Sequence, residues 1–85
     1  MQVKMIVFPG EEGLDVVICG KWTDGVMRCR HFDDRTSMIA MLENLRLITR
    51  EEAQHLENFA FADSCPLYST EVEEDVLAAH GFAPA

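Results

Sequence analysis

The chain contains no apolar run long enough to cross a membrane. Its uninterrupted apolar stretches, such as residues 5–8, fall far short of the about 20 apolar residues that a transmembrane helix needs, and also of a signal-peptide core. The first residues are instead typical of a β-strand. A hydrophobic fraction of 48% and a mean hydropathy of -0.01 predict one small folded α+β domain, residues 1–85, located in the cytoplasm without a membrane partner.

Cysteine is scarce, and its spacing matches no disulfide framework. The three cysteines, Cys19, Cys29 and Cys65, form no CxxC motif, and an odd count is typical of buried thiols in a reducing compartment. Cys29 and His31 stand two residues apart on a predicted strand, which places two metal-ligand types on one face. Two ligands are too few for a metal site, so the sequence predicts no metal and no cofactor.

No residue pattern specific to a catalytic or phosphate-binding site is present. The segment 9–13 carries two acidic residues where a glycine-rich loop would hold a phosphate. Glu51 and His55 lie one helical turn apart, but they do not form an HExxH motif. The sequence therefore predicts a binding module rather than an enzyme. An enzyme would need a pocket that joins His31, His55 or Cys65.

Basic residues are few, and they are unevenly distributed. Seven lysines and arginines stand against fifteen acidic residues, which gives a net charge of -8. A field of that sign opposes bulk binding to nucleic acid. Residues 1–35 nevertheless hold five basic and six acidic residues, whereas residues 36–85 hold two basic and nine acidic ones. The first segment is therefore close to neutral, and the second is strongly acidic.

Turn and cap signals predict an α+β fold. Asp24-Gly25, between two apolar runs, is typical of a type I′ hairpin turn, and Asp33 or Asp34 is expected to cap the first helix. The strands form a three-stranded antiparallel meander, and the helices form a hairpin followed by a carboxy-terminal acidic helix. The predicted strands are residues 3–8, 14–22 and 26–32, and the predicted helices are residues 35–46, 50–62 and 71–80.

Two helix-start signals and one helix-end signal set the limits of the second and third helices. Residues 49–52 and residues 70–73 each fit the capping box, in which a threonine and a glutamate bond reciprocally to the backbone. Gly81 suits the left-handed position that follows a helix, from which Phe82 can reach back to Leu77. The second helix is expected to bury Ala53, Leu56 and Ala60, while the segment 63–69, which contains Cys65, is expected to be a loop.

The hairpin turn assigns each strand side chain to a face. With Asp24-Gly25 at the turn, Lys21 lies opposite Arg28, and Ile18 lies opposite His31. The core face then holds Leu14, Val16, Ile18, Trp22, Met27, Cys29 and His31. Because burying Lys4 would be costly, the first strand is expected to add Val3, Met5 and Val7 to this face. That parity pairs Val7 with Val16, Met5 with Ile18 and Lys4 with Cys19.

The other face divides into a basic part and an apolar part. The basic part is a candidate site for an anion or an acidic partner, and it consists of Lys4, Lys21, Arg28 and Arg30. The apolar part is a candidate protein interface, and it consists of Ile6, Phe8, Val17 and Phe32. Like charges opposite one another destabilise a sheet, so the basic part favours a partner. The apolar part favours a homodimer, because exposed apolar patches usually mark interfaces.

Three explanations of the basic part stay open. Its side chains can lie solvated on the sheet, they can bind an external anion, or the third helix can fold back over this face. In the last case Val72, Val76 and Ala79 would cover the apolar part, and Glu71, Glu73, Glu74 or Asp75 would pair with the arginines. The leading hypothesis is a small interaction or regulatory module that self-associates through this face. The alternative is an anion or nucleic-acid binding module.

Overall fold

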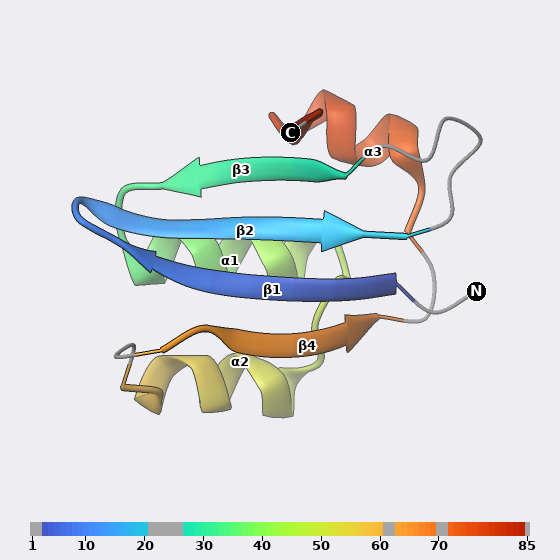
Figure 1. The fold of residues 1–85 in the computed structure, drawn as a ribbon. Coiled ribbons are helices and arrows are strands. Elements are labelled where there is room, and N and C mark those ends of the chain that lie inside the picture. Colours follow the sequence, from blue (N-terminus) through green and yellow to red (C-terminus); the bar gives the residue numbers. More distant parts are fainter. Residues whose placement is uncertain (1–2, 21–26, 61–62, 70–71, 85) are drawn as a thin grey trace.

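The computed structural model describes residues 3–20, 27–60, 63–69 and 72–84, and the predicted turn at Asp24-Gly25 lies outside them. Three strands come first along the chain, followed by two helices and then by a strand, a helix and a short strand (Figure 1). The strands are β1 (Val3–Gly10), β2 (Gly13–Cys19), β3 (Arg28–Phe32), β4 (Cys65–Ser69) and β5 (Ala83–Pro84). The helices are α1 (Arg35–Asn44), α2 (Arg50–Asn58) and α3 (Glu74–Ala79).

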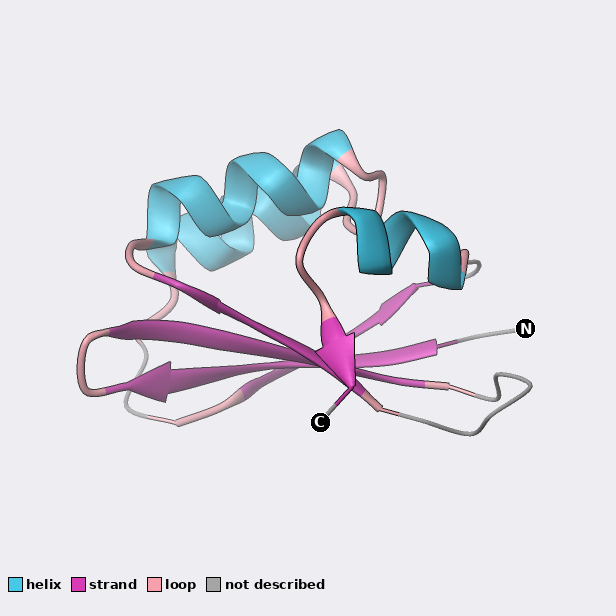
Figure 2. Cartoon of the chain, turned by 90° about the horizontal axis from the view of Figure 1, so that it is seen from above, coloured by secondary structure: helices cyan, strands magenta, loops and turns pink. Residues whose placement is uncertain are grey.

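The described residues form one antiparallel sheet with helices on one side only. The strand order is β4-β1-β2-β3-β5, and all three helices lie against the same face (Figure 2). The α+β class is confirmed, but the meander is extended by a strand at each edge. The segment around Cys65 is not a loop: β4 pairs with β1, with Pro66 opposite Ile6.

The register between β1 and β2 is the one that the cost of burying a lysine predicts. Val7 lies opposite Val16, Met5 opposite Ile18 and Lys4 opposite Cys19. The strands close tightly, with Gly10 opposite Gly13. At Gly13, where φ is +146°, a Cβ atom would collide with the carbonyl oxygen of Phe32, so only glycine fits.

The predicted register between β2 and β3 is wrong. Ile18 lies opposite Arg28, not His31, and Val17 lies opposite Cys29. The offset is three residues, an odd number, and an odd offset moves every side chain of β3 to the other face of the sheet. Arg28, Arg30 and Phe32 therefore face the helices, while Cys29 and His31 face away from them.

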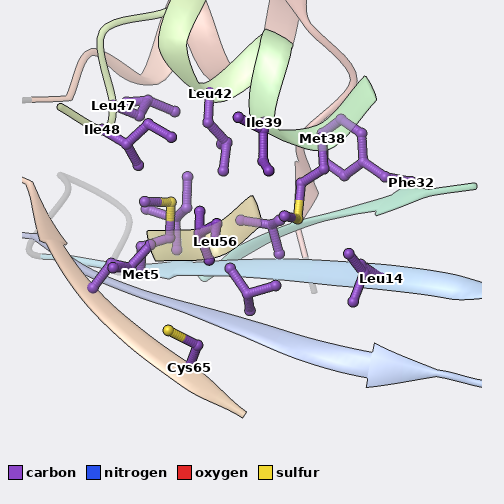
Figure 3. Packing of buried hydrophobic residues seen from close by; sticks show 14 of the residues in the cluster. Met5, Leu14, Phe32, Met38, Ile39, Leu42, Leu47, Ile48, Leu56 and Cys65 are labelled. Carbon is purple, nitrogen blue, oxygen red and sulfur yellow. The ribbon is translucent and has the colours of Figure 1, made fainter. Parts of the chain in front are cut away.

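The hydrophobic core fills the space between the sheet and the helices (Figure 3). β1 and β2 contribute alternate residues, as the sequence predicts. Leu42 from α1 and Leu56 from α2 are completely buried above them, and Phe82 reaches the same core from the end of the chain. Ala60 is exposed rather than buried, because α2 ends at Asn58.

The helix caps match the sequence signals except at the start of α3. Asp34 caps α1 by accepting a hydrogen bond from the Ser37 amide at 2.7 Å, and the capping box between Thr49 and Glu52 is complete. Of the capping box expected at residues 70–73, residues 70 and 71 lie outside the described residues. α3 begins at Glu74, after an N-cap residue, Glu73, that makes no side-chain capping bond.

At the end of α3 the prediction is confirmed. Gly81 adopts a φ of 84°, and the Phe82 amide donates to the Leu77 carbonyl at 3.0 Å. The Gly81 amide donates to the Ala78 carbonyl at 3.3 Å, which completes a Schellman motif. This motif directs the chain back toward the sheet, where β5 pairs with β3.

Candidate functional site

The candidate site is the face of the sheet that the helices leave uncovered, which we call the open face (Figure 2). Register and strand alternation place ten described side chains on it. They belong to Lys4, Ile6, Phe8, Asp15, Val17, Cys19, Cys29, His31, Pro66 and Ala83. All ten are exposed or partly exposed, in contrast to the opposite face, where alternate residues of β1 and β2 are buried.

The middle of the open face is apolar. Ile6, Val17 and Cys29 lie opposite one another on β1, β2 and β3, so they form a row across the sheet. Phe8 stands two residues further along β1 and leaves 39% of its surface exposed. A partly exposed aromatic ring beside a row of half-buried apolar side chains is typical of an interaction surface.

Polar groups lie on the two sides of this apolar row. Lys4 is exposed on one side, and Asp15 and His31 lie opposite each other on the other side. The Asp15 carboxylate accepts a hydrogen bond from His31 Nδ1 at 2.8 Å, and Asp33 Oδ1 lies 3.6 Å from His31 Nε2. The open face is therefore positive at one end of its strands and negative at the other.

The predicted basic part is not assembled. Lys4 lies on the open face, whereas Arg28 and Arg30 lie on the helix side, and Lys21 falls outside the described residues. The physical reason is the odd register offset of β3. Arg28 pairs with Glu74 at 3.1 Å. An ion pair between the third helix and an arginine was one of the three open explanations, but it forms on the helix side of the sheet and not on the open face.

The two arginines hold the carboxy-terminal segment against the sheet. Arg28 donates to the Phe82 carbonyl at 3.3 Å, and Arg30 donates to the His80 carbonyl. The Arg30 guanidinium also lies 4.6 Å from the centre of the Phe32 ring, within the range of a cation–π contact. Cations near carbonyls at the end of a helix are favoured by the helix dipole. Both arginines are thus used inside the fold.

Three of the four residues of the predicted apolar part lie together on the open face, and the fourth is buried in the core. Ile6, Phe8 and Val17 share the open face, but Phe32 is 4% exposed and belongs to the core. Of the three open explanations, the one in which the third helix covers this apolar part is not observed. α3 lies on the helix side, where Leu77 is completely buried.

The corrected register changes the relation between two of the cysteines. Cys19 and Cys29 share the open face, although the sequence placed them on opposite faces. Burial and, to a smaller extent, the charge of Asp15 raise the pKa of the Cys29 thiol. Burial and the charge of Glu52 likewise raise the pKa of Cys65. A raised pKa leaves a thiol protonated and a poor nucleophile.

The described residues give limited support for other kinds of site. They contain no group of three or more His, Cys, Asp or Glu side chains that could hold a metal ion. Two hollows on the helix side, about 300 and 450 Å³ in volume, are lined by neither histidine nor cysteine. In this part of the chain, no helix has the length and apolar character that crossing a membrane requires.

Comparison with known proteins gives no match, whether with protein-family models, with curated proteins or with solved structures.

Proposed function

We propose that this domain is a small interaction module that associates with a second copy of itself through the open face. The observation that carries the proposal is the asymmetry of the sheet. One face packs against three helices, whereas the other presents Ile6, Phe8 and Val17 without a covering element among the described residues. Packing a second sheet onto such a face removes apolar surface from water.

The edges of the sheet are less suited to association than its face. The outer strand β4 contains Pro66, which has no backbone N–H to donate to a further strand. On the other edge, β5 has only two residues, one of them Pro84, so it offers little backbone to a further strand. Pairing through the two edge strands is therefore disfavoured. The face is also self-complementary in charge, because Lys4 and Asp15 lie on opposite sides of the apolar row.

Sedimentation velocity over a range of protein concentrations tests the proposal. We expect the 9.6 kDa chain to sediment at twice its own mass at high concentration. Phe8→Glu, which places a charge in the interface, is expected to be monomeric. Ala40→Glu, which adds the same charge to an exposed position on α1, is expected to remain dimeric. A monomeric native chain, or a Phe8→Glu variant that still forms dimers, would contradict the proposal.

Salt separates self-association from the alternative of anion binding. Two copies that each carry a net charge of -8 repel each other, and salt at about 0.1 M reduces the range of that repulsion to about 10 Å. Self-association is therefore expected to persist or strengthen as salt is added. Retention on heparin at low salt that weakens with added salt, by a chain that stays monomeric, would favour the alternative instead.

A further inference from the structure

The residues of the open face form three parallel rows that run across the strands. The order of these rows determines which residues meet when a second copy packs on this face. The central row is Ile6, Val17 and Cys29. Lys4 and Cys19 form a row on one side, two residues away along the strands. Phe8, Asp15 and His31 form the row on the other side, at the same separation. Two residues of a strand span about 7 Å, so the cationic and acidic rows lie about 13 Å apart.

We propose that two copies pack face to face about a twofold axis that runs across the strands, along the central row. Such an axis places the central row against itself and exchanges the two outer rows. The exposed Lys4 of each copy then lies over Phe8 of the other, one strand away from Asp15. Its methylene stem packs on the ring, and its ammonium group pairs with the carboxylate. This inference rests on the proposed function, because it requires that the open face binds a second copy.

Charge favours this axis over a twofold axis that runs along the strands. An axis that runs along the strands, between β1 and β2, would place Lys4 against Cys19 and Asp15 against the Phe8 ring. Neither charge would then find a partner, and the carboxylate would lose water against an aromatic face. The axis across the strands pairs both charges and leaves only apolar groups at the centre. Asp15 can take part because its side chain is 41% exposed despite its bond to His31.

Charge reversal tests the arrangement through the dissociation constant of the dimer, measured by sedimentation. Lys4→Glu and Asp15→Lys are each expected to weaken dimerisation by about tenfold or more, because the twofold axis doubles the effect of one change. The variant with both changes is expected to return to within about threefold of the native constant. Arg50→Glu, a charge reversal at an exposed position on α2, is expected to leave the constant unchanged.

Mixing the two single variants gives a second, independent readout. In a dimer of Lys4→Glu with Asp15→Lys, both contacts across the axis join opposite charges, so the mixture is expected to associate although each variant alone is weakened. An ion pair within one chain would not produce this result. If Asp15→Lys does not fold, as judged by circular dichroism, Asp15→Asn replaces it and must weaken the native dimer.

The outcomes separate the inference from the proposed function. A native chain that is monomeric at every concentration overturns both. A native dimer that the single reversals do not weaken overturns the twofold arrangement alone, as does a dimer that neither the double variant nor the mixture restores. Recovery in both the double variant and the mixture supports the axis across the strands.

Discussion

Replacing Phe82 with alanine tests whether the carboxy-terminal segment belongs to the hydrophobic core. The Phe82 side chain is 1% exposed, and its ring packs edge-on against Phe32 with the ring centres 6.3 Å apart. Its backbone is fixed as well, because its amide donates to Leu77 and its carbonyl accepts from Arg28. The substitution removes a buried ring from a site whose backbone cannot move to fill the space. Such changes cost about 3–5 kcal/mol.

That cost is large for a chain of this size. At about 0.05–0.15 kcal/mol per residue, 85 residues give a total unfolding free energy of about 4–13 kcal/mol. Urea unfolding followed by circular dichroism measures the loss. In a thermal scan, we expect the midpoint to fall by about 12 °C or more. A variant with a nearly native midpoint would show that α3 and β5 are not needed for the core.

The matched control is Phe8→Ala, which removes the same ring from a surface position. Phe8 leaves 39% of its surface exposed, and its removal creates no enclosed cavity, so we expect a loss of about 1 kcal/mol. Both variants are measured at two protein concentrations, so that any contribution from association is separated from folding. Equal losses for Phe82→Ala and Phe8→Ala would refute the assignment of Phe82 to the core.

Two further predictions concern a backbone position and a buried thiol. Arg46 follows the C-cap of α1 at a φ of 58°, in the same position that Gly81 occupies after α3. Because glycine adopts this left-handed conformation without strain, Arg46→Gly is expected to stabilise the fold by about 0.5–1 kcal/mol in urea unfolding, and a destabilised variant would contradict this. Because the pKa of Cys65 is raised above its ordinary value of 9.0, the folded chain keeps this proton after the unfolded chain has lost it. Stability should therefore fall as pH rises above about 9, and less steeply in Cys65→Ala; equal slopes would argue against this thiol.

The parts of the fold that could be predicted are those in which nearby residues decide the outcome. The register of β1 against β2 follows because the other parity would bury Lys4 and expose three apolar residues. The capping box at Thr49 and the glycine turn at Gly81 depend on groups at most a few residues apart. In each case the alternative has a visible local cost, and the sequence alone shows it.

β4 was missed because its signals favour a loop. Proline is unfavourable within a sheet, since it cannot donate a ladder hydrogen bond, and Pro66 follows Cys65 directly. An edge strand tolerates proline, however, and β4 is an edge strand. Its place beside β1 depends on a pairing across about 60 residues of sequence, such as that between Ile6 and Pro66, for which no local pattern exists.

The wrong register of β3 is the reason that the predicted basic residues do not lie together. The sequence shows that burying the arginines of β3 is costly, but it does not show the distant partners that offset this cost. One parity buries Cys29 and His31, and the other buries part of two arginines together with Phe32. Taken alone, β3 favours the first, because a buried guanidinium without partners is costly. The partners exist, but Glu74 and the His80 and Phe82 carbonyls lie 46 to 54 residues further along the chain. The segment that pairs with the arginines also keeps them away from the open face. Among the described residues, the open face is therefore left with its apolar row and a single lysine, Lys4.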